Sequence, residues 1–139
     1  MGEILVNPVI SQDWTAYLDT DVAVWLAERK LKCISARAVE QIEALSLLIS
    51  PIVLVEIELR HEIARSKLST SEIARMLLEN HGVLVCDLPF ATIAVAALDE
   101  KWTRDPFDRL IVANAKANGF AWLISADEAI RKHYPRTVW

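Results

Sequence analysis

Short apolar runs alternate with segments of helical periodicity along most of the chain. Each run is bounded by polar or turn-forming residues, as expected of strands that are buried on both faces. Between the runs, apolar residues recur every three or four positions, which predicts helices that pack on a sheet. The predicted strands cover residues 16–18, 45–50, 83–86 and 120–124, with a candidate edge strand at 137–139. The predicted helices cover residues 22–29, 36–44, 69–80, 89–102 and 128–133, and two more begin at 51 and 106. This alternation predicts an α/β fold with a central, mostly parallel sheet and helices on both faces.

The region from Arg104 to Asp127 has the clearest element boundaries. Asp105 is placed as an N-cap, and the proline after it suits the first helical position, where a missing N–H costs nothing. Asp108 falls in the first turn of this helix, near the positive end of its dipole. Gly119 ends the helix, and Asp127 directly follows the next strand. Acids at these two kinds of position lie where α/β folds build their sites.

The start of the chain is harder to assign. Residues 4–6 are either a short strand or part of a loose N-terminal extension that covers residues 1–15. Residues 16–139 are expected to form a single domain without linkers or repeats, because the chain is long enough for one hydrophobic core of its own.

Two more acids lie at positions from which they can reach a site at the edge of the predicted sheet. Asp19 directly follows the first strand, so in a parallel sheet it lies on the same edge as Asp127. Glu56 belongs to the helix that begins at residue 51, and Glu58 is its competitor two residues away. Glu56 is favoured because it lies beside an apolar stripe that is expected to face the core, formed by Ile52, Val55, Leu59 and Ile63.

The overall charge limits the partners that the chain attracts. The net charge is −4 at pH 7, so there is no global basic field that draws in nucleic acid. A nucleic-acid substrate therefore requires metal ions that mask the acids, or a local basic rim. Candidates for the rim are Lys30, Lys32, Arg37, Arg60 and Lys67, whose alternative role is an ordinary solvated surface.

Nothing in the sequence indicates export or membrane insertion. No apolar run reaches the roughly 18 residues of a membrane span, and the first residues lack the basic and apolar regions of a signal peptide. Cys33 and Cys86 have no metal-binding or redox spacing, which favours buried, reduced thiols. A cytoplasmic location is therefore expected.

A cluster of Asp19, Glu56, Asp108 and Asp127 requires compensation of its charge. Two carboxylates about 5 Å apart repel each other by roughly 3 kcal/mol at an effective dielectric constant of about 20. Oxygen ligands without a histidine or cysteine partner select Mg²⁺ or Mn²⁺ over Zn²⁺. Divalent ions in such a carboxylate site most often activate water for in-line attack on a phosphodiester.

Four segments of the chain resemble successive motifs of a known family. They are LDTDVAVW, the glutamate within VEIELR, RDPFDRLIVANA and LISAD, of which the third is the most specific. In this order they are similar to the motifs of PIN-domain ribonucleases, especially the toxins of VapC-type toxin–antitoxin pairs. The resemblance covers residues 16–139. It implies a PIN-like three-layer α/β/α fold, metal-dependent cleavage of RNA, a homodimer, and inhibition by a small antitoxin protein.

The resemblance also implies which residues form the site. The four acids of the family match Asp19, Glu56, Asp108 and Asp127, which would bind Mg²⁺ or Mn²⁺, and the small hydroxyl residues beside them match Thr20 and Ser125. Two features depart from the family. About 15 residues precede the first strand, and Asp21 stands where the toxins often carry His or Asn. Asp21 is either an extra acid of the site or a cap for the helix that follows.

Several of these residues also have a purely structural explanation. Asp105 is an N-cap or a metal ligand, and Asp108 can be no more than a favourable first-turn acid. Asp19 and Asp127 can each cap the helix that follows. Arg109 either holds a phosphate or pairs with a nearby acid. Four caps at once explain the pattern less well than a single site does.

Two other functions fit parts of the sequence. Asp19, Thr20 and Asp21 imitate the DxD nucleophile motif of haloacid-dehalogenase-like phosphohydrolases, but no later lysine and paired-acid motif follows. The remaining hypothesis is a non-catalytic PIN-like module that binds a protein or RNA with an inherited acidic pocket.

Overall fold

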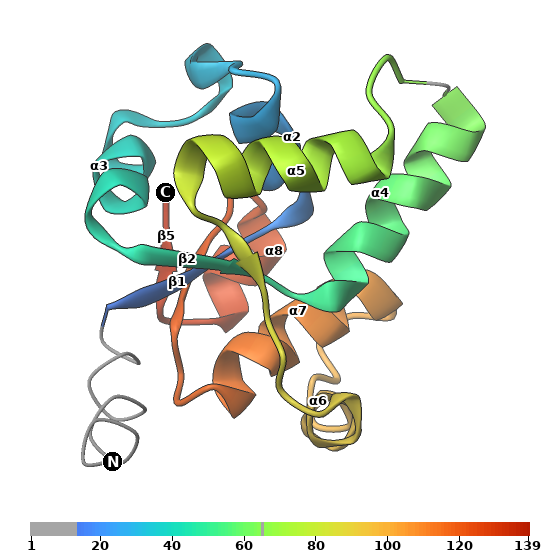
Figure 1. Cartoon of the computed structure of the whole chain (residues 1–139). Coiled ribbons are helices and arrows are strands. Elements are labelled where there is room, and N and C mark those ends of the chain that lie inside the picture. Colours follow the sequence, from blue (N-terminus) through green and yellow to red (C-terminus); the bar gives the residue numbers. More distant parts are fainter. Residues whose placement is uncertain (1–13, 65) are drawn as a thin grey trace, which may run out of the picture.

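Figure 1 shows the computed structural model, which describes residues 14–64 and 66–139. These residues form a central five-stranded sheet in which every neighbouring pair of strands is parallel. The strand order is β3-β2-β1-β4-β5, so β1 lies in the middle and is buried along its whole length. The strands are β1 (Thr15–Leu18), β2 (Ser46–Ile49), β3 (Leu84–Val85), β4 (Trp122–Ile124) and β5 (Thr137–Val138).

Helices cover both faces of this sheet. In Figure 1, α2, α3 and α5 lie on one side of the sheet and α6 and α7 on the other. The predicted three-layer α/β/α architecture with a mostly parallel sheet is therefore confirmed. The described helices are α2 (Thr20–Ala27), the 3-10 helix η1 (Leu31–Cys33), α3 (Ala36–Ala44), α4 (Pro51–Ala64), α5 (Thr70–His81), α6 (Phe90–Ala97), α7 (Pro106–Ala117) and α8 (Glu128–His133).

The parallel strands bring several chain segments to one edge of the sheet, which we call the carboxyl edge. Leu18 pairs in register with Ile124, and the N–H of Asp19 donates to the carbonyl oxygen of Ile124 at 3.0 Å. Helix α4 begins directly after β2, at the same edge. Helix α7 returns the chain to the start of β4, so its first turn also lies at the carboxyl edge. The ends of β1 and β4 and the starts of α4 and α7 therefore meet there.

Local capping explains where the helices begin and end. The Ser35 hydroxyl accepts the N–H of Ala38 at the start of α3, and Ser69 and Glu72 form a reciprocal capping box at the start of α5. Gly82 ends α5 with a φ of 66°, in the left-handed region that glycine adopts without strain. Sequence signals of this kind fix element ends because they satisfy the otherwise unpaired N–H and C=O groups.

The predicted helix over residues 89–102 is too long, since α6 ends at Ala97. The following turn carries Glu100, whose side chain is buried and accepts hydrogen bonds from Lys116 Nζ at 2.7 Å and Trp102 Nε1 at 2.9 Å. This buried ion pair with α7 fixes the turn and outweighs the helical tendency of the apolar residues before it.

Strand β4 is also shorter than predicted, because Phe120 has a φ of 56° and belongs to the turn after α7.

The predicted core stripe of α4 is wrong. Val55 and Leu59 are exposed, and Ile63 has 86% of its surface exposed. The residues of α4 that face the core are Val53 and Ile57. Of the predicted stripe, only Ile52 packs partly against the core, and the rest is an apolar outer face. The helix is apolar on more than one side, so spacing alone could not identify the buried side.

Three further expectations concern the thiols, the membrane and the N-terminus. Cys86 is buried as expected, whereas Cys33 is exposed because η1 lies at the surface, and both are free. None of the described helices is long and apolar enough to cross a bilayer. The candidate strand at residues 4–6 and most of the predicted N-terminal extension lie outside the described residues.

Candidate active site

Asp19 lies at the centre of the carboxyl edge, just past the end of β1. The residue is only 8% exposed. Its Oδ2 accepts the hydroxyl of Ser125 at 2.6 Å, and its Oδ1 accepts the backbone N–H of Thr20 at 2.9 Å. Ser125 follows β4 directly, so the pairing of β1 with β4 is what brings these two side chains together.

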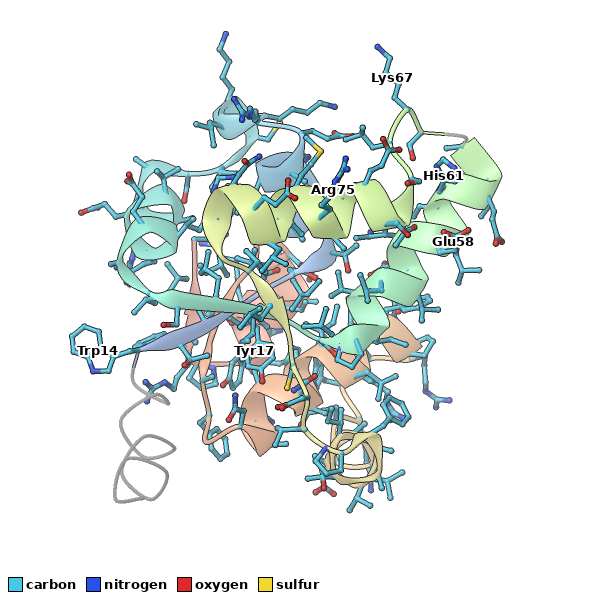
Figure 2. All side chains as sticks on the ribbon, viewed as in Figure 1. Trp14, Tyr17, Glu58, His61, Lys67 and Arg75 are labelled. Atoms are coloured by element: carbon cyan, nitrogen blue, oxygen red, sulfur yellow. The ribbon has the colours of Figure 1, made fainter. Side chains whose placement is uncertain are left out.

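Glu56 reaches this edge from α4. One oxygen of its carboxylate, Oε1, accepts the hydroxyl of Thr20, which is the residue next to Asp19. The other oxygen, Oε2, accepts Nη2 of Arg60 at 3.0 Å. The side chain of Glu56 is 15% exposed. Its competitor Glu58 instead accepts the hydroxyl of Thr70 at 2.7 Å, on the side of α5 (Figure 2).

Asp127 adds a carboxylate from the loop after β4. Its backbone N–H donates to the Ser125 hydroxyl at 3.1 Å, so one serine touches both Asp127 and Asp19. Its Oδ1 also accepts the N–H of Ile130 at 3.0 Å, which makes Asp127 the N-cap of α8. The two roles predicted as alternatives are compatible, because the cap occupies one carboxylate oxygen.

Asp108 projects from the first turn of α7. Its pKa is raised from 3.8 to about 7, chiefly by burial and in addition by the negative charges of four neighbouring acids. These acids are Asp105, Asp19, Asp127 and Glu56. They include the other three sequence-predicted acids, so the fold brings Asp108 within electrostatic reach of each of them.

The negative charge of each acid makes ionisation of its neighbours less favourable. Burial, as the largest cause, raises the pKa of Asp19 from 3.8 to about 6, and the charges of Asp21 and Glu56 add to the effect. The hydrogen bonds from Ser125 and from the N–H of Thr20 oppose this rise but do not cancel it. A set of carboxylates whose pKa values are raised by burial and by their mutual repulsion gains free energy when a cation enters.

The chemistry of these donors fits a hard divalent cation. Asp19, Glu56, Asp108 and Asp127 offer only carboxylate oxygens, the ligands that Mg²⁺ and Mn²⁺ prefer. Across residues 14–64 and 66–139, no three His, Cys, Asp or Glu side chains already stand close enough together to hold a metal ion. The carboxylates of Asp19, Glu56 and Asp127 instead accept hydrogen bonds from protein donors, which are the hydroxyls of Thr20 and Ser125, the guanidinium of Arg60 and the N-terminus of α8.

The remaining sequence candidates have mainly structural contacts. Asp105 caps α7, because its Oδ1 accepts the N–H groups of Phe107 at 2.8 Å and Asp108 at 3.4 Å. Arg109 donates from Nε to the carbonyl oxygen of Glu100 at 2.7 Å, so it anchors the turn before α7.

Arg60 was expected only as part of a basic rim, and its position beside the acids was missed. Its Nη1 donates to Asp21 Oδ1 at 2.6 Å while its Nη2 holds Glu56. The available signal was the spacing, since Glu56 and Arg60 are four residues apart on a helix and therefore face the same side.

A second polar cluster was also missed, because its residues come from β1, the end of β3 and the C-terminal half of α7, which are far apart in the sequence. Tyr17 extends from β1 to the side of the sheet that α7 covers (Figure 2). Its hydroxyl donates to Cys86 Sγ at 3.1 Å and accepts the side-chain amides of Asn114 at 3.1 Å and Asn118 at 2.8 Å.

Comparisons with known proteins agree with this architecture. The sequence model of the PIN domain matches residues 16–134. No curated protein sequence matches the chain. Among solved structures, a chain of the crystal structure of VapBC2 from Rickettsia felis, bound to a DNA fragment from their promoter, superposes with a TM-score of 0.57. The match covers 88% of this chain and 95% of that chain at 18% identity, which shows a common fold. Because the family model spans most of its length, the chain belongs to the PIN-domain family.

Proposed function

We propose that this protein is a metal-dependent endoribonuclease. The observation that carries the proposal is the convergence of four acids at the carboxyl edge, where burial first and then the charges of neighbours that include Asp19, Asp127 and Glu56 raise the pKa of Asp108 to about 7. Membership of the PIN-domain family supports it, because PIN domains are generally nucleases and generally use divalent metals.

Each side chain has a distinct role in the proposed reaction. Asp19, Asp108 and Asp127 hold Mg²⁺ or Mn²⁺, and Glu56 completes this set of ligands or orients the attacking water. When bound, the cation supplies Lewis acidity, lowers the pKa of water and stabilises negative charge on the phosphate oxygens. Ser125 and Thr20 keep the carboxylates of Asp19 and Glu56 in place through their hydroxyls.

We further propose that the protein is the toxin of a toxin–antitoxin pair. It would act on RNA in the cytoplasm, form a homodimer and be inhibited by a small antitoxin protein. The fold shared with a chain of VapBC2 supports this assignment. The exposed apolar face of α4, formed by Val55, Leu59 and Ile63, is a surface that a protein partner can cover.

The test is cleavage of RNA with Mg²⁺ by the wild type and by Asp19→Asn. The substitution keeps the shape of the side chain but removes its charge, so we expect activity to fall about 100-fold or more. Asp99→Asn is the matched control, because Asp99 is exposed and does not contribute to the raised pKa of Asp108. Equal cleavage by Asp19→Asn and the wild type would contradict the proposal.

The biological assignment has a separate test. Expression of the wild type should arrest growth, and co-expression of the small open reading frame adjacent to its gene should relieve the arrest. Asp19→Asn should be harmless at equal protein level. Harmless expression of an active wild-type nuclease would contradict the toxin role while leaving the nuclease role intact.

A further inference from the structure

Arg60 is a cation placed between two carboxylates at the acidic site. Its guanidinium donates from Nη2 to Glu56 Oε2 at 3.0 Å and from Nη1 to Asp21 Oδ1 at 2.6 Å. Glu56 lies one helical turn earlier on α4, and Asp21 lies in the first turn of α2. The arginine therefore links α4 to α2 directly beside Asp19 and Thr20.

The two contacts of Glu56 fix its carboxylate completely. Oε1 accepts the hydroxyl of Thr20 and Oε2 accepts Arg60, so both oxygens are directed by donors on different elements. An isolated glutamate on a helix surface samples several rotamers, and two opposed hydrogen bonds remove that freedom. Within the part of the chain that the structure describes, Glu56 is the one of the four acids that forms an ion pair.

Asp21 gains a specific role from this geometry. Its side chain is 54% exposed, so it has no need of a partner for burial, yet it binds the guanidinium of Arg60 at the shortest distance of any ion pair among the described residues. Asp21 thereby serves as a second anchor, which holds Nη1 of Arg60 while Nη2 binds Glu56.

A contact of Arg60 with the RNA backbone is the main alternative. A phosphate would compete for the same Nη1 and Nη2 groups that the two carboxylates already occupy. The side chain of Arg60 is 47% exposed, and it lies over the acids rather than on an open basic surface. The observed contacts therefore favour action on Glu56 over action on the substrate.

We propose that Arg60 is a positioning residue that orients the Glu56 carboxylate toward the site, with Asp21 as its second anchor. This rests on the proposed function, because the orientation of Glu56 matters for catalysis only if the acids cleave RNA. Arg60 itself touches neither the substrate nor the metal.

The kinetic test compares Arg60→Gln and Arg60→Lys with the wild type. We expect Arg60→Gln to lower kcat about tenfold and to change KM for RNA less than about twofold, because a misplaced catalytic group affects the chemical step. Arg60→Lys keeps the charge but lacks the two-armed fork, so it should recover only part of the loss. The control is Arg75→Gln, which removes an exposed arginine of α5 (Figure 2) and should leave both parameters unchanged.

Two results would overturn the positioning role. A raised KM with unchanged kcat would show that Arg60 binds the RNA backbone, and full recovery by Arg60→Lys would show that only charge matters. In a Glu56→Gln background, Arg60→Gln should cause no further loss of kcat, because its effect passes through Glu56. Additive losses would contradict the proposal.

A readout without metal or RNA separates this proposal from the nuclease function. Urea unfolding with a chelator should show non-additive effects of Arg60→Gln and Glu56→Gln, whereas Arg75→Gln and Glu56→Gln should be additive. Additivity for both pairs would overturn the Arg60–Glu56 link even if RNA is cleaved. A wild type that cleaves no RNA would overturn the proposed function and with it the catalytic role of Arg60.

Discussion

Two polar clusters in this protein draw on the same two regions, the end of β1 and the helix α7. The inner cluster joins Tyr17 of β1 to Asn114 of α7, in the interior. The outer cluster includes Asp19, two residues after Tyr17, and Asp108 in the first turn of α7. The negative charge of Asp19 contributes to the raised pKa of Asp108. Their members are close in sequence, but their chemistry differs in one respect, which is charge.

The inner cluster is neutral, and its hydroxyl and amide donors find acceptors, although Asn114 Oδ1 is buried without a partner among the described residues. Burial raises the pKa of the Tyr17 hydroxyl above its usual value, so Tyr17 remains a donor to Cys86 and an acceptor for two asparagine amides. The outer cluster contains like charges, and burial together with their proximity raises the pKa values of Asp19 and Asp108. Burial of polar groups therefore stabilises the fold when partners match, and prepares a cation site when charges are left unmatched.

The largest expected contrast comes from removing one charge of the outer cluster. Asp108→Asn should lower RNA cleavage about 100-fold or more, because it removes a metal ligand, while folding stays intact. The matched change in the inner cluster, Asn114→Ala, should leave cleavage per folded molecule within about twofold of the wild type. The measurement is the cleavage rate normalised to the folded fraction. An equal loss of activity in the two variants would contradict the contrast between the clusters.

The second contrast is in stability. Asn114→Ala should lower the free energy of unfolding by about 1–3 kcal/mol, because the buried hydroxyl of Tyr17 and the thiol of Cys86 lose a partner and a cavity remains. Urea denaturation checks this, with Asn80→Ala on the exposed side of α5 as the control. A loss no larger than that of the control would mean that the inner cluster does not stabilise the fold.

The third contrast is in pH dependence without metal. Asp108 has a folded-state pKa of about 7 against 3.8 in the unfolded chain, so the folded state binds more protons between these values. Its contribution to stability is present below about pH 4 and is lost as the pH rises through about 7. Unfolding curves recorded with a chelator should show a stability that falls over this range, with a shallower fall for Asp108→Asn. An identical slope in the two proteins would contradict the raised pKa.

The smallest effect is expected at the cap of α7. Asp105→Asn keeps an N-cap side chain, so stability should change by less than about 0.5 kcal/mol and cleavage by less than about twofold. Asp105→Ala removes the cap and should lower stability by about 1 kcal/mol. Thermal melts and cleavage assays check both variants. A large loss of cleavage in Asp105→Asn would place Asp105 among the metal ligands.

Much of the fold was predictable because its signals are local. The N-caps Ser35 and Asp105 and the stop at Gly82 follow from single residues that satisfy helix ends. The alternation of strands and helices then limits the topology to a parallel sheet, which places Asp19 and Asp127 on one edge before any coordinate is known.

The parts that were not predictable depend on contacts between distant residues. The early end of α6 results from the ion pair between Glu100 and Lys116, which are 16 positions apart. The outward face of α4 was mistaken for its core face because the helix is apolar on several sides. The link from Arg60 to Asp21 joins two helices 39 positions apart, and no local pattern of charge specifies such a pair.

Calorimetric titration of Mn²⁺ into the wild type and into Asp108→Asn at pH 7.5 tests the central claim most directly. If the four acids form one cation site, the wild type should bind Mn²⁺ and Asp108→Asn should bind it at least about tenfold more weakly. Equal affinity in the two proteins, or no binding to the wild type, would contradict the claim that the outer cluster is a metal site.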